Sequence, residues 1–379
     1  MSGSMVSRLP GGPKTVVAFL AILFAYTVQT ESTQHIQHAL RYEKPLLLLY
    51  VTHSSFTFLL PIQLLVLRVT TGRPISHFLG LLKRDVQKQL DHVRSKVGLG
   101  PAHTSVSFFL TLLSILVLIM LGITIPAVSW FVALPLTSMA NVTSIYNTFS
   151  IWALVFSVIF LNEEWNYLQA FAVLLGVVGV GIVSYASTQP VTIAAQTIKP
   201  IVSRAMLGNS LALLGAIWMA AYEVLYKLIA TVPDENHAGF RPLASSPEHA
   251  DEHATHHNED HEEAAPTEEP LPFGMHAMAM TSGIGLTTFV LLWAMLLVAH
   301  LVDFEPLALP PNGETLGWIV MGASCGMIFN GCFSILLSLW GPVLASMSCL
   351  LTTVIVQLTD LVLGVPLSFV CLLPWENKG

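Results

Sequence analysis

Nine runs of apolar residues determine what this chain can fold into. They lie near 14–32, 45–68, 105–134, 137–161, 166–187, 207–229, 275–302, 315–339 and 342–365. A helix of about 20 apolar residues is long enough to cross the hydrocarbon core of a bilayer. Within lipid every backbone polar group must be paired inside its own element, which favours helices over open strands. The sequence therefore predicts an all-α transmembrane protein with about nine spans.

The scarcity of charge agrees with this prediction. Charged residues make up 10% of the chain, whereas soluble domains carry about 25%, so lipid must cover the exterior. The cysteines Cys325, Cys332, Cys349 and Cys371 lie in or beside apolar runs and have no CxxC spacing. We interpret them as small apolar residues rather than disulfide or zinc ligands. No catalytic constellation and no cofactor motif is visible, so we expect neither an enzyme nor a bound cofactor.

The segment 69–104 is the most basic loop of the predicted topology. The positive-inside rule places such a loop in the cytosol. Two spans separate it from the N-terminus, which is then cytosolic as well. The first run lacks a clear cleavage site and is interpreted as a retained helix rather than a signal peptide. The cations here and just before are Arg68, Arg73, Lys83, Arg84, Lys88, Arg94 and Lys96, against Asp85 and Asp91.

A second polar segment, 231–273, divides the chain into two apolar parts. Residues 233–272 contain six histidines and eleven acids without apolar periodicity, which predicts a disordered cytosolic linker. The organisation that follows is a first repeat in 1–189, a sixth span in 205–230, the linker, the rest of the second repeat in 274–366, and a short C-terminal stub in 367–379. Imidazoles suit transition metals, so weak metal binding by the linker is an alternative that rests on His253, His256, His257 and His261.

The two apolar parts look related to one another. The run Thr143–Asn162 aligns loosely with Ala345–Gly364. Both begin with small polar residues and then turn apolar. Because the predicted topology makes them cross the membrane in opposite directions, the alignment indicates an inverted repeat, in which a substrate site lies at the repeat interface.

Four stretches resemble the drug/metabolite transporter superfamily, in its EamA-type, solute carrier family 35-like branch of fungal membrane transporters. The fourth helix and its acidic turn are matched by MANVTSIYNTFSIWALVFSVIFLNEEW (Met139–Trp165), and the Gly-rich fifth helix by LLGVVGVGIVSYAS (Leu174–Ser187). The start of the second half is matched by AIWMAAYEVLYKLI (Ala216–Ile229), and the ninth helix by LWGPVLASMSCLLTTVIVQLTDLVLG (Leu339–Gly364).

This resemblance implies an inverted-repeat helical bundle of ten helices, five in each half. Here only VPLSFVCLLPWENKG follows Gly364, so we expect the usual tenth span to be missing or truncated. The resemblance also implies a secondary transporter of a metabolite, vitamin or nucleotide-sugar-like solute in an endomembrane, the vacuole or the Golgi.

Polar residues inside spans are costly and are therefore candidates for function. Glu223 and Lys227 in the sixth span are four residues apart, so they either contact solute or neutralise one another as an ion pair. Polar residues of the fourth and ninth spans either line the pathway or bond between helices. The candidates for the substrate pathway are Tyr146, Asn147, Tyr222, Glu223, Lys227, Gln357 and Asp360.

The leading functional hypothesis is a transporter that works by alternating access. One alternative is a divalent metal-cation transporter with the His-rich loop as its sensor. The other is a membrane scaffold or receptor that transports nothing. As partners we expect a small-molecule substrate and membrane lipid but no nucleic acid, with a homodimer left open.

Overall fold

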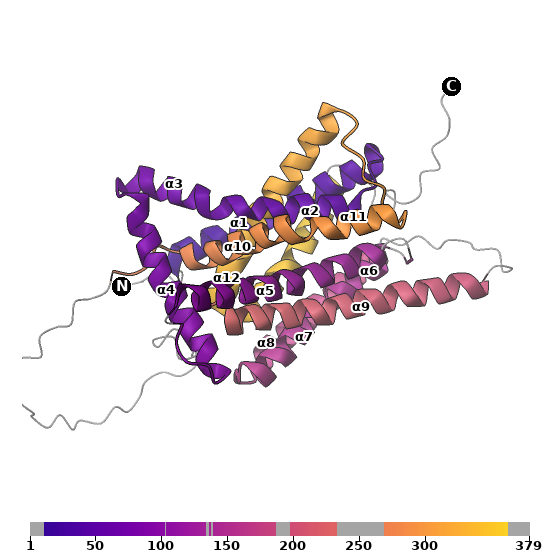
Figure 1. The fold of residues 1–379 in the computed structure, drawn as a ribbon. Coiled ribbons are helices and arrows are strands. Elements are labelled where there is room, and N and C mark those ends of the chain that lie inside the picture. Colours follow the sequence, from indigo (N-terminus) through magenta and orange to yellow (C-terminus); the bar gives the residue numbers. More distant parts are fainter. Residues whose placement is uncertain are drawn as a thin grey trace, which may run out of the picture.

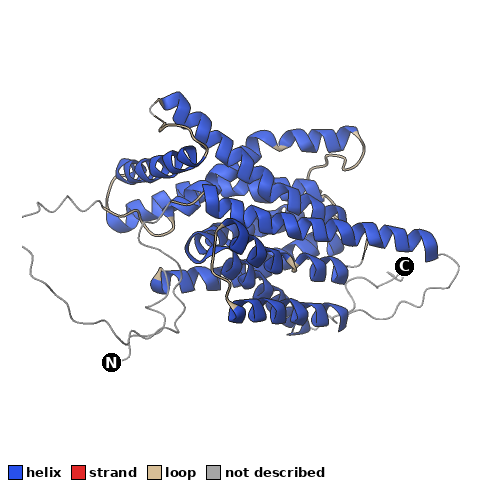
Figure 2. Ribbon diagram, turned by 90° about the horizontal axis from the view of Figure 1, so that it is seen from below, coloured by secondary structure: helices blue, strands red, loops and turns tan. Residues whose placement is uncertain are grey.

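The computed structural model describes residues 11–102, 104–133, 136–137, 139–186, 198–232 and 269–362. All regular structure in these ranges is helical (Figures 1 and 2). Most of the described part of each predicted apolar run forms helix. Six helical segments are long and apolar enough to cross a membrane, namely Gly12–Gln37, Pro45–Thr71, Ser105–Trp130, Ala205–Ile229, Met275–Leu301 and Gly313–Ile355. Because two further apolar helices are shorter, the expectation of nine full spans stays a prediction.

The first two predicted spans form three helices. Helix α1 (Gly12–Gln34) continues into a π-helical turn, and α2 (Pro45–Ser55) continues through a 3₁₀ turn (Phe56–Phe58) into α3 (Leu59–Thr71). A proline in the first turn starts both α1 and α2. Proline suits that position because its fixed φ is helical and its missing N–H would have no helical partner.

The basic segment 69–104 was expected to be a loop, but most of it is helix α4 (Ile75–Lys96). The buried residues Phe78, Leu82, Val86 and Leu90 recur every four residues and bury one stripe of the helix. Such a stripe is typical of an amphipathic helix on a core. Helix α4 crosses one end of the bundle (Figure 1) and contacts α3, α5 and α10; we call this the α4 end.

The third to sixth predicted spans are less regular than the sequence indicates. The fourth is split in two by a turn at Asn147–Thr148. The sixth extends further towards the N-terminus than predicted. The helices are α5 (Ser105–Ala133), α6 (Met139–Tyr146), α7 (Phe149–Phe160), α8 (Tyr167–Ala186) and α9 (Ile198–Ile229).

The rest of the second half consists of α10 (Met275–Leu291), α11 (Trp293–Leu301) and α12 (Gly313–Val362). Helix α12 joins the last two predicted spans across a kink at Gly341, whose φ of 81° and ψ of 175° are not helical. Glycine adopts positive φ without steric cost. The proline at position 342 also interrupts the hydrogen-bond ladder of the helix.

The core of the bundle lies between segments far apart in the sequence. The most extensive pairings are α1 with α12 and α5 with α9, and α10 packs against α2, α3, α5 and α12. A Cβ on Gly285 of α10 would lie 2.3 Å from the backbone nitrogen of Thr57, so glycine permits backbone contact there. Large apolar residues such as Phe24, Phe171 and Trp293 stay exposed on the outside, as expected for a surface that faces lipid.

Candidate functional site

The break in the fourth predicted span places polar groups at the centre of the bundle. Helix α6 ends at Tyr146 and α7 begins at Phe149. Between them, Asn147 is buried, and the hydroxyl of Thr148 donates a hydrogen bond of 2.6 Å to the carbonyl oxygen of Ile145. Interrupted helices at membrane depth occur where the backbone is buried in protein or lines a pathway.

Four helices bring ionisable side chains together at this break. The hydroxyl of Tyr146 lies close enough to Tyr26 of α1, Glu223 of α9 and Cys349 of α12 to interact with each electrostatically. We call these four residues the central cluster. The ring of Tyr26 also packs on that of Phe329, with 5.1 Å between the ring centroids. The cluster therefore joins the first half of the chain to the second within an apolar bundle.

Glu223 is the carboxylic acid of this cluster. Its side chain is fully buried, and within the part of the chain that the structure describes neither carboxylate oxygen has a hydrogen-bond partner. The predicted neutralisation by Lys227 through a hydrogen-bonded pair is therefore not formed. Instead the ammonium group of Lys227 donates to the carbonyl oxygen of Ser338 on α12.

Lys227 belongs to a second group of residues, near the kink of α12. Glu163, which follows α7, has its Oε1 atom 3.3 Å from where a Cβ on Gly341 would lie. Partial desolvation raises the pKa of Glu163 above its usual value, and the charge of Lys227 opposes this. Because the side chain is exposed, we expect water to moderate both effects. We call Glu163, Lys227, Ser338 and Gly341 the kink cluster.

The tyrosines of α9 flank Glu223 on its own helix. Tyr222 and Tyr226 are buried and lie edge to face, with ring centroids 6.1 Å apart. The hydroxyl of Tyr226 donates to the carbonyl oxygen of Ala277 on α10 at 3.5 Å. Nearby, Thr281 donates to the hydroxyl of Ser334 at 2.8 Å. These contacts hold α9, α10 and α12 together, so Tyr226 has a structural role that the sequence did not indicate.

The predicted polar stripe of the ninth span is only partly described. The hydroxyls of Ser346 and Thr353 bond to carbonyl oxygens of their own helix, at 2.8 and 3.2 Å. The backbone of Gln357 and Asp360 is helical, whereas their side chains lie outside what the structure describes. The linker histidines His253, His256, His257 and His261 and the C-terminal stub also lie outside the described residues.

Sequence reasoning missed a buried polar contact at the α4 end. Gln89 of α4 is fully buried, and its amide donates to the carbonyl oxygen of Ile229 at 2.6 Å. The oxygen of the same amide, Oε1, lies 2.8 Å from Nε2 of His276 on α10. A glutamine within the apolar stripe of α4 was the signal that could have revealed it, since buried amides are normally hydrogen-bonded.

A second missed contact lies at the start of α2, beside the loop that follows α11. The buried carboxylate of Glu305 accepts hydrogen bonds from the backbone N–H groups of Leu46 and Leu47, at 2.8 and 3.0 Å. Unpaired N–H groups at a helix start favour an acidic partner. Glu305 therefore caps α2 from a loop distant in sequence.

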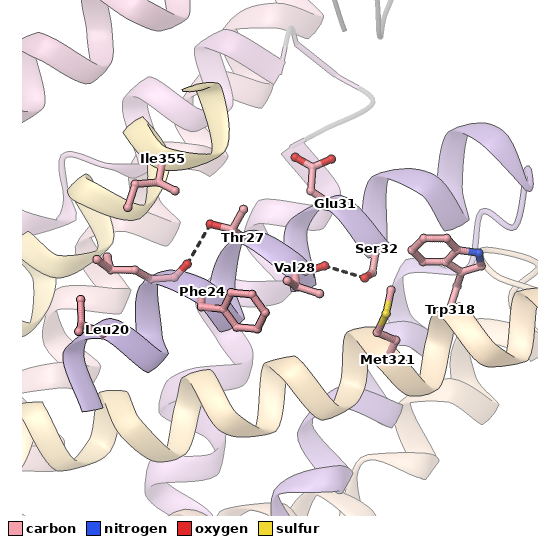
Figure 3. A pocket seen from close by; sticks show the side chains of 10 residues that line it. Leu20, Phe24, Thr27, Val28, Glu31, Ser32, Trp318, Met321 and Ile355 are labelled. Carbon is pink, nitrogen blue, oxygen red and sulfur yellow. Dashed lines mark hydrogen bonds between the residues drawn. The ribbon is translucent and has the colours of Figure 1, made fainter. Parts of the chain in front are cut away.

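A cavity of about 530 Å³ lies between α1 and α12 (Figure 3). The hydroxyls of Thr27 and Ser32 donate hydrogen bonds to backbone carbonyl oxygens of their own helix, at 2.9 and 2.6 Å. They are therefore not donors to a molecule in the cavity. Exposed Phe24 lines one side. The cavity does not include the residues of the central cluster. Apart from Glu31, Thr27 and Ser32, its wall is apolar, which suits lipid chains or the apolar part of a solute.

The described residues contain no group of three or more His, Cys, Asp or Glu side chains that could hold a metal ion. Zinc sites in proteins use three or four such ligands. The metal-transporter alternative therefore has no support within the described helices.

Comparison with known families finds a similarity over part of the chain. Residues 58–185 match the EamA-like transporter family. This part of the chain is similar to EamA-like transporters. The match covers α3 to α8 and includes Tyr146, Asn147 and Glu163, and it supports the resemblance to the drug/metabolite transporter superfamily. Together with the apolar helices, it makes the chain a multi-pass membrane protein.

Other comparisons bear on the fold alone. A solved structure titled "Crystal structure of protein" aligns over 93% of this chain and 88% of its own length, with a TM-score of 0.50 and 12% sequence identity. No curated protein sequence matches the chain. The likeness in fold extends beyond the EamA-like domain into the second half.

Proposed function

We propose that the protein is a secondary transporter that moves a small organic solute across a membrane by alternating access. The observation that carries the proposal is the central cluster, in which groups from α1, α9 and α12 lie within electrostatic range of Tyr146 of α6 inside an apolar bundle. Ionisable residues inside membrane helices are expensive, and they typically mark solute or proton pathways. The EamA-like domain supports the same conclusion.

The break at Asn147–Thr148 and the kink at Gly341 supply the flexible points that such a mechanism needs. Transporters with inverted repeats bind solute where the repeats meet, beside interrupted helices. We propose that Tyr146, Asn147 and Glu223 contact solute. The kink cluster would then belong to the gate at the α4 end.

The proposal includes an orientation. The cations of α4 are a reason to place the α4 end in the cytosol, and the N-terminus with it. An endomembrane location and a solute carrier family 35-like substrate, such as a metabolite, vitamin or nucleotide sugar, follow from the resemblance. The inverted repeat of two related halves is part of the same proposal.

Uptake by purified protein in liposomes tests this function. The liposomes are offered a panel of radiolabelled amino acids, vitamins and nucleotide sugars, with protein-free liposomes and an active EamA-like relative as controls. We expect saturable uptake of at least one compound. If the folded protein takes up none while the relative is active, the transporter proposal fails and the scaffold hypothesis replaces it.

A further inference from the structure

Glu223 is a buried acid without a visible counter-charge. Its position in α9 is six residues before Ile229, the last residue of the helix, which places it about 9 Å along the axis from the α4 end. Its side chain has no exposed surface, and among the described residues neither oxygen has a hydrogen-bond partner. An ionised carboxylate in such a place is strongly disfavoured, whereas a protonated carboxyl is tolerated.

Among the residues that the structure describes, none around Glu223 supplies a cation that bonds to it. The helices packed most extensively against α9 are α5, α6, α7 and α12, and single hydrogen bonds also join α9 to α10 and α4. The sequences of α5 and α7 contain no titratable side chain. The titratable groups near Glu223 are Tyr146 from α6, Cys349 from α12 and Tyr222 on α9. The nearest cation on the same helix, Lys227, donates to Ser338 instead.

We propose that Glu223 binds the proton that couples solute movement to a proton gradient. This inference rests on the proposed transport function. In the described conformation the carboxyl is neutral and closed off. When the bundle opens to one side, the carboxyl O–H bond breaks, the proton passes to water on that side, and the carboxylate remains. When the bundle opens to the other side, the carboxylate takes a proton from water there.

The position suits this exchange for two reasons. Glu223 shares the central cluster with residues of α1, α6 and α12, so movement of these helices changes its surroundings directly. It also lies one helical turn from Lys227, which bonds α9 to α12 beside the kink at Gly341. Opening at the kink would therefore admit water near Glu223 and favour the carboxylate.

The first test needs no substrate. Infrared spectra of the purified protein in lipid at neutral pH are recorded for the wild type, Glu223→Gln and Glu314→Gln. We expect a carbonyl stretch of a protonated carboxylic acid that Glu223→Gln abolishes and that is retained in the control Glu314→Gln, which changes an exposed acid at the start of α12. If Glu223→Gln folds and the band is unchanged, or if the wild type shows no such band, the proposal is overturned.

The second test measures coupling in liposomes loaded with the pH dye pyranine. The probe is whichever compound of the uptake panel the wild type transports. With one proton moved for each solute, a gradient of one pH unit changes steady-state accumulation about tenfold. We expect this response and the accompanying dye signal in the wild type. We expect both to be lost in Glu223→Gln and restored in Glu223→Asp, which can still carry a proton.

These outcomes separate the two claims. If the wild type transports solute but its accumulation ignores the pH gradient, the proton proposal fails and the transporter proposal stands. If the wild type transports nothing on the panel, the transporter proposal fails, and so does the coupling that rests on it. The infrared spectra then still decide whether Glu223 is a protonated acid.

Discussion

Lys227 on α9 donates a hydrogen bond to the backbone carbonyl oxygen of Ser338 on α12, three residues before the kink at Gly341. The carbonyl groups that precede a proline in a helix lose their usual N–H partner. A lysine from a neighbouring helix can satisfy such a group with a charge-assisted bond. The contact therefore stabilises both the kink and the packing of α9 against α12.

Replacing Lys227 with methionine tests this role. Lys227→Met keeps the length of the side chain but removes the donor, so we expect the free energy of unfolding to fall by about 1 to 3 kcal/mol. Thermal melting in detergent measures the change. The control is Lys83→Met on the exposed face of α4, for which we expect a change within about 0.5 kcal/mol. Equal melting temperatures for both variants would contradict the role of Lys227.

Backbone contact between α10 and the turn after α2 predicts a strict need for glycine. In Gly285→Ala the added methyl carbon would lie 2.3 Å from the nitrogen of Thr57 and 2.8 Å from the carbonyl carbon of Phe56. Overpacking of this kind costs about 1 to 3 kcal/mol, and we expect a clear drop in melting temperature. In Gly179→Ala nothing lies within 4 Å of the new methyl, so this variant should melt at the wild-type temperature or slightly above. The reverse order would show that α10 packs differently.

The buried amide of Gln89 predicts that α4 is an integral part of the bundle. Gln89→Leu leaves the carbonyl oxygen of Ile229 and the ring of His276 without this partner. Each buried polar group that loses its partner costs about 1 to 3 kcal/mol. The control is Gln87→Leu on the same helix, where the amide is only partly buried and bonds to Asp91. A double-mutant cycle of Gln89→Leu with His276→Leu should show coupling, and additive effects would argue against a direct contact.

The apolar helices could be predicted from the sequence because lipid imposes a length of about 20 apolar residues on each span. Helix α4 could not be predicted in this way, because the segment is rich in charged residues and was interpreted as a basic loop. Its apolar stripe consists of Phe78, Leu82, Val86 and Leu90. The kink at Gly341 was visible only as a boundary between two runs. Whether the runs form nine full spans depends on tilt and packing, which apolar length does not determine.

The candidate site was only partly predictable for a related reason. Glu223 was identified because an acid in an apolar run is costly wherever it lies. The spacing to Lys227 left a local ion pair open, whereas the structure shows that Lys227 donates to an acceptor 111 residues away on α12. Tyr26 was missed because one tyrosine in an apolar helix is unremarkable until the fold places it beside Tyr146. Long-range contacts of this kind leave no local pattern.

Glu269, just before α10, predicts a pH effect at the α4 end. The hydrogen bond from Arg73 lowers the pKa of this exposed carboxyl, and the charges of Arg73 and His77 act in the same direction. A lowered pKa means that the folded state favours the carboxylate. Its contribution to stability is therefore present above the ordinary glutamate pKa and is lost as the pH falls through the lowered value.

Carbon-13 NMR titration of the Glu269 carboxyl measures this shift. We expect Arg73→Ala to raise its pKa towards the ordinary value. The control Arg68→Ala removes an exposed cation that, among the described residues, is not an ion-pair partner of Glu269, so it should leave most of the shift in place. If both variants titrate like the wild type, the contact between Arg73 and Glu269 is not present in solution.

The transport pathway gives the last prediction. Tyr146→Phe removes the hydroxyl that lies among Tyr26, Glu223 and Cys349 but keeps the ring that packs against Gly215. Loss of one hydrogen bond to a solute costs about 1.4 kcal/mol, so uptake at low solute concentration should fall roughly tenfold. The control is Tyr167→Phe at the exposed start of α8, which should transport normally. Because the ring stays in place, we expect both variants to melt like the wild type. Wild-type uptake by Tyr146→Phe would place the solute elsewhere in the bundle, and the cavity between α1 and α12 would then be the next site to test.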